Sequence, residues 1–470
     1  FRKGHKPPQW LMIVLRKWQA DCLDKAKAHY QSHRDYFVQA TPGSGKTRFA
    51  AELARWLLEE QLIDFVICFA PTREVVAGMQ RTFSAVLDQR FGNVIASAGA
   101  AYTYQSMEYQ QEEFWDIFKK FRVLAIFDEI HHCAGHDPLL SNTWGQQIIR
   151  NIQDQATYTL GLSGTPWRSD DLPIALARYS DPEGQLICDY RYDLQSAVNE
   201  GVCRAPRITL IDNPLIRLVE EKENTESVRG FSCFSQLLSE SPVSYEDLLR
   251  HDDILNAVLD IGIQQLSETR HKIPQAGGLV VATDIEHAHQ IAAILNAKHQ
   301  SYVVVTSKTP RAQQLIDRFR HDNTCWIVAV SMISEGTDIQ RLSVCCYLSR
   351  IRTELHYRQV LGRILRKMGT DDREAWLYVI AEPTLRKYSQ RIANDLPEDQ
   401  STLQAKKLND RLTKSHAEHA DGNTEGAKES EDNPLSVKEQ NGKRELQVTE
   451  ASLLTLSFSQ YYRQYLLSLM

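Results

Sequence analysis

The segment YFVQATPGSGKT, residues 36–47, constrains the fold more than any other part of the chain. A short apolar run leads into a loop that contains Gly43 and Gly45, and an amphipathic helical pattern follows it. Glycines allow backbone amides to close around phosphate oxygens, Lys46 supplies a positive charge, and the Thr47 hydroxyl can bind Mg²⁺. The segment therefore predicts a strand, a phosphate-binding loop and a helix in direct succession. The candidate loop residues are Thr41, Gly43, Ser44, Gly45, Lys46 and Thr47.

Short apolar runs alternate with helical patterns up to about residue 385. The first series of strand candidates is Tyr36–Gln39, Phe65–Phe69, Val94–Ser97, Val123–Phe127 and Tyr158–Leu162. The second series is 278–282, 302–306, 326–331, 344–349 and 375–380. Strands that are separated by helices indicate parallel sheets. We therefore expect an α/β fold with two tandem domains, 1–205 and 206–390, and a helical insertion at about 214–256.

The composition changes after this part of the chain. Residues 391–450 are polar, contain few apolar residues and no aromatic ones, and are expected to form a disordered acidic linker. In the last segment, 451–470, apolar residues recur at steps of three and four, which predicts an amphipathic C-terminal helix. These residues are Leu454, Phe458, Tyr461, Tyr465 and Leu469. Such a helix would either fold back onto the body of the protein or bind a partner protein.

The overall composition excludes several classes of protein. Apolar residues make up 42% of the chain, which is enough for substantial cores, and no run approaches the roughly 20 apolar residues of a membrane span. The 9 cysteines are scattered, and neither a disulfide framework nor a signal peptide is recognisable, so we expect a cytoplasmic protein. The chain begins with Phe1 and not with Met, so the sequence leaves open where the native chain starts. A net charge of −6 neither demonstrates nor excludes nucleic-acid binding.

A second polar motif follows the strand candidate at 123–127. The segment VLAIFDEIHH places Asp128 and Glu129 directly after an apolar run. Ligands collect at the carboxyl ends of the strands in such sheets. Asp128 can hold Mg²⁺, and Glu129 can orient and deprotonate the water molecule that attacks a γ-phosphate.

The nearby histidines allow an alternative interpretation as zinc ligands. His131, His132, Cys133 and His136 form a cluster, but no second cluster with zinc-ligand spacing follows at a useful distance. We therefore favour a role for the histidines, His131 in particular, in the switch of an ATPase.

The motifs ATPGSGKT and DEIH resemble those of the superfamily 2 helicases, and in particular the DExH group that includes the motor subunits of type III restriction enzymes. Further motifs follow in the expected order over about residues 15–370. The resemblance implies two tandem RecA-like domains with the ATP site in the cleft between them. It also implies ATP and Mg²⁺ as cofactors, and nucleic-acid contacts that are largely independent of base sequence.

In the first domain the resemblance assigns roles to three weaker motifs. LRKWQ (15–19) is similar to the adenine-recognition segment, which makes Gln19 the residue that would bind the base. PTRE and TYQS resemble two nucleic-acid motifs, and they imply that Arg73 and Thr103 contact phosphates of the strand. SGT (163–165) resembles the motif that couples ATP binding to nucleic-acid binding.

In the second domain two motifs carry the resemblance. SEGTDI (334–339) resembles motif V, in which Gly336 permits a tight turn and Asp338 helps to couple the domains. QVLGRILR (359–366) resembles motif VI, whose two arginines reach the γ-phosphate in this family. The spacing of four and then three residues places Gln359, Arg363 and Arg366 on one helical face. The candidate catalytic residues are thus Lys46, Asp128, Glu129, His131, Gln359, Arg363 and Arg366.

These motifs lead to one principal functional hypothesis. We expect an ATP-dependent nucleic-acid translocase or helicase that acts on DNA, in DNA repair or in defence against foreign DNA. Two alternatives remain open at this point. One is an RNA helicase, since no residue is recognisable that would distinguish the 2′-hydroxyl. The other is an ATP-gated sensor or clamp that acts through a partner protein bound to the C-terminal tail.

Overall fold

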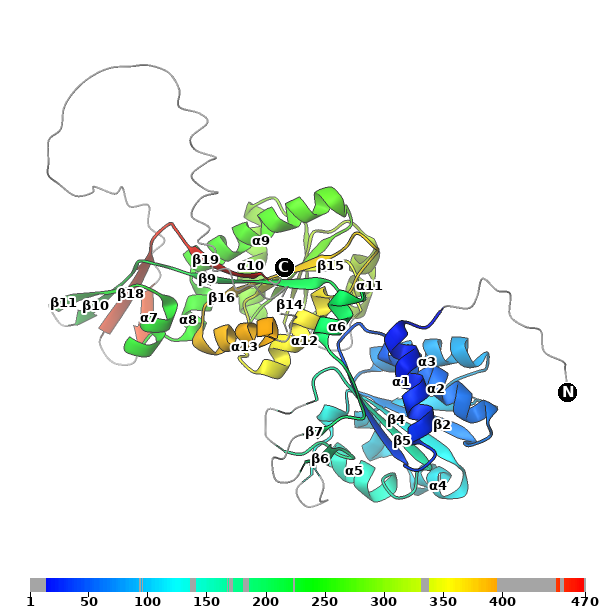
Figure 1. The fold of residues 1–470 in the computed structure, drawn as a ribbon. Helices are drawn as coiled ribbons and strands as arrows, with labels where there is room; N and C mark the ends of the chain where they lie inside the picture. The colour runs from blue at the N-terminus through cyan, green and yellow to red at the C-terminus, as the bar shows by residue number, and fades with distance from the viewer. Residues whose placement is uncertain are drawn as a thin grey trace, which may run out of the picture. The chain divides into compact units, whose positions relative to one another are not determined.

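Two compact units make up the chain in the computed structural model (Figure 1). Unit 1 comprises Phe1–Arg204, Ile333–Ile339 and Thr353–Arg373, and unit 2 comprises Ala205–Met332, Gln340–Arg352 and Glu374–Met470. The structure describes residues 14–92, 94, 96–135, 141–166, 168, 172–180, 186–222, 225–330, 338–394, 445–448 and 452–468. Unit 1 thus includes two segments that the sequence placed in the second domain, 333–339 and 353–373.

A parallel sheet forms the centre of unit 1. In the described residues its strand order is β3-β2-β4-β5-β1-β8, and each neighbouring pair is parallel. The strands are β1 (Asp35–Ala40), β2 (Phe65–Ala70), β3 (Gly99–Thr103), β4 (Val123–Asp128), β5 (Tyr158–Ser163) and β8 (Tyr190–Tyr192), and β6 (Arg178–Tyr179) and β7 (Leu186–Ile187) form a separate short pair. The helices are α1 (Lys17–His29), α2 (Lys46–Glu59), α3 (Arg73–Leu87), α4 (Glu112–Lys120), α5 (Thr143–Asn151), α6 (Leu194–Asn199) and α12 (Glu354–Ile364), with 3₁₀ turns at Tyr104–Tyr109 and Ile130–His132.

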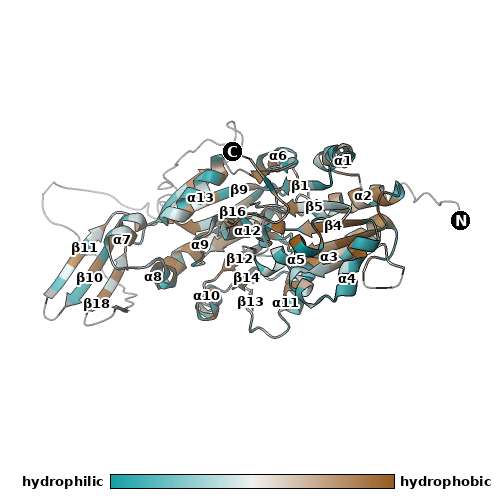
Figure 2. Ribbon diagram, turned by 90° about the horizontal axis from the view of Figure 1, so that it is seen from below, coloured by the Kyte–Doolittle hydropathy of each residue, from teal (hydrophilic) through white to brown (hydrophobic). Residues whose placement is uncertain are grey.

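The central strand β4 is buried along its whole length, as expected for a parallel strand that is covered on both faces. Val123, Ala125 and Phe127 share one core with Trp115 of α4 and Ile148 of α5. The alternate side chains of β4 point to the opposite face, where α2 and α3 lie (Figure 1). Figure 2 shows the same division, with an apolar β4 and a largely polar outer surface on α4.

The predicted strands of the first series are confirmed except for one. Residues 94–97 are not a strand where they are described, and Val94 is exposed. The strand β3 begins at Gly99 instead, and a Cβ atom at Gly99 would lie 2.0 Å from the carbonyl oxygen of Val66. The close approach of the two backbones therefore requires glycine at this position. Because the strand begins with small residues, its sequence lacks the usual pattern of β-forming side chains.

Unit 2 contains a second, mostly parallel sheet. In the described residues its order is β13-β14-β12-β15-β16-β9-β19, and only β19 runs antiparallel to its neighbour. The strands are β9 (Ala205–Asp212), β12 (Gly277–Val281), β13 (Tyr302–Val305), β14 (Trp326–Ala329), β15 (Leu342–Tyr347), β16 (Glu374–Ile380) and β19 (Arg463–Ser468). The helices are α7 (Phe234–Glu240), α8 (Tyr245–Arg250), α9 (Asp252–Lys272), α10 (Ile285–Ala297), α11 (Ala312–His321) and α13 (Pro383–Asn394). The second predicted series of strands is confirmed, and the α/β prediction with two parallel sheets is correct. The sequence pattern missed β9.

The prediction of a helical insertion at 214–256 is wrong in its first half. This segment begins with the hairpin of β10 (Ile216–Lys222) and β11 (Thr225–Phe231), and the helices α7 and α8 follow. Ile216 and Leu218 are buried while Arg217 between them is exposed, which is the alternation of a strand.

The prediction of a C-terminal helix is also wrong. Residues 452–458 form β18, which pairs with β10 and with β17 (Glu445–Val448), and β19 pairs with β9. Leu454 and Leu456 are buried and lie two residues apart, so the period of two decides the structure. The helical spacing arose by chance from apolar residues of two different strands. The predicted linker, 391–450, lies largely outside the described residues.

No helix in the described parts of the chain is long and apolar enough to cross a membrane.

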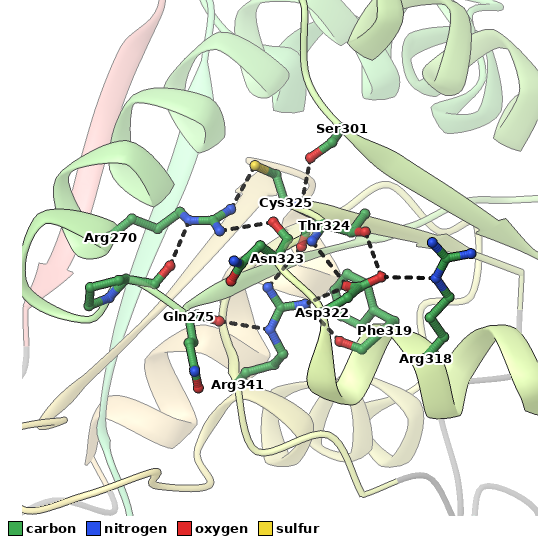
Figure 3. A network of polar contacts seen from close by, with 11 residues as sticks. Arg270, Gln275, Ser301, Arg318, Phe319, Asp322, Asn323, Thr324, Cys325 and Arg341 are labelled. Carbon is green, nitrogen blue, oxygen red and sulfur yellow. Dashed lines mark hydrogen bonds and ion pairs between the residues drawn. The ribbon is translucent and has the colours of Figure 1, made fainter.

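A buried arginine joins the starts of three strands in unit 2 (Figure 3). The Arg341 guanidinium donates hydrogen bonds to the carbonyl oxygens of Gln275, Phe319 and Thr324 at 2.7, 2.8 and 2.8 Å. Gln275 and Thr324 lie near the beginnings of β12 and β14, and Phe319 lies in α11. Arg341 itself directly precedes β15 and is 2% exposed. The loops at this edge of the sheet are therefore held by one side chain.

We expect Arg341→Ala to lower the free energy of unfolding by about 3 kcal/mol, because one buried and two partly buried carbonyl groups would lose a charged donor. Arg318 lies in the same network but is 81% exposed, and Arg318→Ala should change stability by less than about 0.5 kcal/mol. Urea denaturation of the two variants measures the difference. Equal losses would contradict the structural role of Arg341.

We also expect removal of 445–470 to destabilise the protein, because it leaves the edges of β9 and β10 unpaired and removes buried leucines. The apparent melting temperature should fall by about 5 °C or more. Deletion of 405–435, which lies outside the described residues and belongs to the linker predicted from composition, is the control and should leave the melting temperature close to that of the full chain. A terminal truncation as stable as this control would contradict the pairing of β18 and β19.

Candidate nucleotide-binding site

The phosphate loop, residues 40–47, connects β1 to α2. Gly43 and Gly45 have φ angles of 80° and 95°, in the left-handed region that favours glycine. A Cβ atom at Gly45 would lie 2.7 Å from Nε2 of Gln19, so a larger residue would also clash there. Helix α2 begins at Lys46, and the amides of a first helical turn have no acceptor within the helix. These amides can therefore bind an anion.

Side chains at the start of α1 hold the phosphate loop in place. Arg16 and Trp18 donate hydrogen bonds to the carbonyl oxygen of Ser44, at 2.5 and 3.2 Å. Gln19 donates from Nε2 to the carbonyl oxygen of Gly45 at 2.9 Å, and its Oε1 accepts from the amide of Arg16. Gln19 thus lies against the loop, and its recognition of adenine stays a prediction. Sequence reasoning selected Gln19 but missed the neighbouring Arg16 and Trp18.

Lys46 forms an ion pair with the end of strand β4. Its Nζ lies 3.1 Å from Oε1 of Glu129 and 3.2 Å from the carbonyl oxygen of Ala40. The lysine is 9% exposed, so both contacts are shielded from water. Two residues that the sequence predicted as partners in one site therefore lie in direct contact.

Glu129 also connects β4 to the end of β5. Its backbone is left-handed at φ 51°, and its Oε2 accepts hydrogen bonds from the amide of Gly164 at 3.1 Å and from Oγ of Ser163 at 3.3 Å. Nδ1 of His131 lies 2.9 Å from Oγ of Ser163 and 3.5 Å from Oε2 of Glu129. His131 is 1% exposed, so the predicted switch histidine belongs to the core of the site.

The two acidic side chains have opposite pKa shifts. Burial raises the pKa of Asp128, and the negative charge of Glu129 raises it further. Burial alone would raise the pKa of Glu129 as well, but the charges of Lys46 and His131 and the Gly164 amide hold it well below its usual range. Glu129 is therefore the carboxylate that stays ionised at neutral pH. A group in that state can accept a proton from water.

Asp128 fits the requirements of a Mg²⁺ ligand. Its backbone carbonyl accepts a hydrogen bond from the Tyr104 hydroxyl at 2.8 Å, which fixes the end of β4. Its Oδ1 is buried and has no donor among the described residues, and the same is true of the buried Ser44 hydroxyl. A buried acceptor without a donor is costly unless a ligand or an ion compensates it. Thr47, the other predicted Mg²⁺ ligand, is half-buried at the first turn of α2.

Zinc ligation has no support in the part of the chain that the structure describes, where no group of three His, Cys, Asp or Glu residues could hold a metal. His136, which belonged to the histidine cluster in the sequence, lies outside the described residues.

The arginine-bearing helix α12 packs onto the phosphate loop within unit 1. A Cβ atom on Gly362 would lie 2.8 Å from the Cβ of Pro42, so the helix and the loop are in close contact. The Arg366 side chain lies beside Gly43, with its Cγ 3.1 Å from the position of a Cβ atom there, and it forms an ion pair with Asp338.

The other predicted residues of this region are less informative. Gln359 and Arg363 are half-buried on α12, and Gly336 lies outside the described residues.

The two predicted nucleic-acid contacts lie at or just after the ends of two adjacent strands of the sheet in unit 1. Thr103 ends β3, and Arg73 begins α3 shortly after the end of β2. These strands are parallel, and Ala70 is the register partner of Thr103. Both residues therefore lie at the carboxyl edge of the sheet, where Asp128 also lies. Arg73 is exposed there, and Thr103 is half-buried.

Two family models match this chain. Residues 12–168 match the family described as "Type III restriction enzyme, res subunit", and residues 256–368 match the family described as "Helicase conserved C-terminal domain".

Two curated proteins are similar in sequence. An uncharacterized protein of Mycobacterium leprae is 31% identical over 391 residues, which cover 79% of this chain and 62% of the relative. The chain thus spans less than two thirds of that protein. The second, named "DNA 3'-5' translocase XPB2", is from Sulfurisphaera tokodaii, and it is 26% identical over 78% of this chain and 81% of its own length.

The fold also has a counterpart among solved structures. A fragment from Vibrio vulnificus YJ016, assigned to the HsdR subunit of a type I restriction enzyme, superposes with a TM-score of 0.56. The identity is 16%, and the match covers 82% of this chain and 67% of the fragment. Both matched models and the parallel sheets agree with the motifs in the sequence. The chain therefore belongs to the superfamily 2 helicases, and its first domain is of the type III restriction enzyme kind.

Proposed function

We propose that this chain is a DNA translocase or helicase that hydrolyses ATP at the phosphate loop and moves along a strand. One observation carries the proposal: Lys46, Glu129 and the buried Oδ1 of Asp128 meet at the carboxyl ends of β1 and β4. Phosphoryl transfer requires a cation for the phosphates, a general base and a ligand for the metal ion beside a glycine-rich loop. Lys46, Glu129 and Asp128 would supply these three groups.

The triphosphate of ATP fits the phosphate loop by charge and by geometry. The first-turn amides of α2 and the Lys46 ammonium would bind its β- and γ-phosphates. Asp128 and Thr47 would hold Mg²⁺, which neutralises charge on the phosphates and would supply the buried Oδ1 of Asp128 with a partner.

Binding of the phosphates would also change the partner of Lys46. Lys46 now pairs with Glu129, and a phosphate would compete for the ammonium group. Glu129 would then keep its contacts with Gly164 and Ser163 and accept the proton of the attacking water. Arg366, beside Gly43, and Arg363 are the cations that would stabilise the charge that develops on the γ-phosphate.

DNA is the proposed polymer because the archaeal relative is named as a DNA translocase. Arg73 and Thr103 would contact backbone phosphates, and such contacts carry no base-sequence information. The C-terminal strands β18 and β19 belong to the body of unit 2, so the described part of the tail is not a free helix that could bind a partner.

We expect Lys46→Ala to reduce ATP hydrolysis by about 100-fold or more, because it removes the cation nearest the phosphates. Steady-state hydrolysis by the purified protein measures this effect. Lys119→Ala, at an exposed lysine of α4, is the matched control and should hydrolyse ATP like the wild type. Hydrolysis by Lys46→Ala at the control rate would contradict the assignment of the phosphate loop.

The same assay identifies the polymer when single-stranded DNA, duplex DNA or RNA is added. We expect DNA to stimulate hydrolysis more than RNA of the same length. Stimulation by RNA alone would favour an RNA helicase. Polymer binding that depends on ATP, without movement of the protein along the strand, would favour a clamp.

We expect Glu129→Gln to lower the rate of hydrolysis by about 10²–10⁴-fold, the usual contribution of a general base, while nucleotide binding persists. Single-turnover hydrolysis and equilibrium binding of a fluorescent nucleotide separate the two effects. Glu112→Gln, in the first turn of α4, is the control. Unchanged hydrolysis by Glu129→Gln would exclude Glu129 as the base.

A further inference from the structure

A buried ion pair lies where the chain leaves unit 1. Nε of Arg204 donates a hydrogen bond to Oδ1 of Asp372 at 2.6 Å, and its Nη2 pairs with Oδ2 of the same carboxylate. The two side chains are 0% and 4% exposed, and the residues are 168 positions apart in the sequence. Two parallel hydrogen bonds of this kind fix orientation as well as distance.

The same arginine holds the end of the motif VI helix. Its Nη1 donates to the carbonyl oxygen of Ile364 at 2.7 Å, and its backbone amide donates to the carbonyl oxygen of Leu365 at 2.8 Å. Ile364 is the last residue of α12, and Arg366 lies two residues after it. The last carbonyl groups of a helix have no hydrogen-bond donors within the helix, and Arg204 supplies donors to two of them here.

Asp372 holds the other side of this turn. Its Oδ2 accepts a hydrogen bond from the amide of Met368 at 2.9 Å. The backbone is thus fixed immediately before Arg366 by Arg204 and two residues after it by Asp372. Cys203 adds a third constraint, because it forms an antiparallel bridge with Arg366.

This turn is also tied to the phosphate loop. Sγ of Cys203 lies 3.6 Å from the carbonyl oxygen of Pro42, and Gly362 of α12 packs against the ring of Pro42. The segment that carries Arg204 therefore lies against both the loop that would bind the phosphates and the turn that carries Arg366. A shift of the turn would move the Arg366 side chain relative to Gly43.

We propose that Arg204 and Asp372 are positioning residues for phosphoryl transfer: their ion pair fixes the turn that presents Arg366 to the phosphate loop. The inference rests on the proposed ATP hydrolysis and adds two residues to it that carry no helicase motif. The side-chain hydrogen bonds of the pair join the two residues to each other and to the backbone at Ile364 and Met368, on either side of Arg366, so both would act through Arg366.

The test compares kcat and KM for ATP in Arg204→Lys and Asp372→Asn. Lysine keeps the charge but cannot form the two parallel hydrogen bonds. We expect kcat to fall by about 10- to 100-fold, the effect of a small displacement of a catalytic group, and KM to remain within about twofold. Arg207→Lys is the matched control, because Arg207 and Glu374 form an ion pair between the same two segments in unit 2, two and three residues beyond Asp372 and Arg204. Its kcat should equal that of the wild type.

A double-mutant cycle separates positioning from a general loss of structure. In an Arg366→Ala background, Arg204→Lys should lower kcat by less than about twofold further, since the group that it positions is already absent. A full additional loss of kcat, or a KM that rises in place of a falling kcat, would overturn the proposal. Asp372→Asn must give the same pattern, and it carries the test if Arg204→Lys does not fold by circular dichroism.

Failure of this inference is distinguishable from failure of the proposed function. If the wild type hydrolyses ATP, loses this activity in Lys46→Ala and retains full kcat in Arg204→Lys and Asp372→Asn, the positioning role alone is overturned. If the wild type shows no hydrolysis that depends on Lys46, the proposed function is overturned and the positioning role with it.

Discussion

The ion pair between Lys46 and Glu129 is the interaction on which the rest of the site depends. It exists because the strand order β1-β5-β4 brings the phosphate loop and the acidic motif to the same edge of the sheet, with only β5 between them. The end of β5 then supplies Ser163 and Gly164 as hydrogen-bond donors to the same carboxylate. The charge of Lys46 also keeps Glu129 ionised although the side chain is partly buried, and a general base must be ionised.

Under the proposed function, the same pair would give the site two distinct states. Lys46 and Glu129 satisfy each other in the structure described, whereas a bound triphosphate would take the lysine and leave the glutamate for water. The arginine that completes this chemistry is held by a separate set of contacts, from Pro42 to Gly362 and from Arg204 to the end of α12. One set of residues, with Lys46 and Glu129, would therefore bind the nucleotide, and another set, with Arg204 and Gly362, fixes the backbone that positions Arg366.

Local patterns predicted most of the strands and the meeting of the three charged motif residues, because a parallel sheet brings the ends of its strands together. They failed where the pattern was ambiguous. The sequence pattern did not predict β3, because its first residue, Gly99, must lack a side chain to fit against the backbone of Val66. The C-terminal segment was predicted to be a helix because apolar residues of β18 and β19 are spaced three and four residues apart. No local pattern could have revealed Arg204 and Asp372, since the residues meet only in the folded chain.

The structure of the protein with Mg²⁺ and a non-hydrolysable ATP analogue tests the central claim most directly. The account predicts phosphates against the amides of Gly45, Lys46 and Thr47, with the Lys46 ammonium moved from Glu129 to a phosphate oxygen. It also predicts Mg²⁺ within reach of Oδ1 of Asp128. A nucleotide bound elsewhere, or a Lys46–Glu129 pair that remains intact beside bound phosphates, would contradict the account.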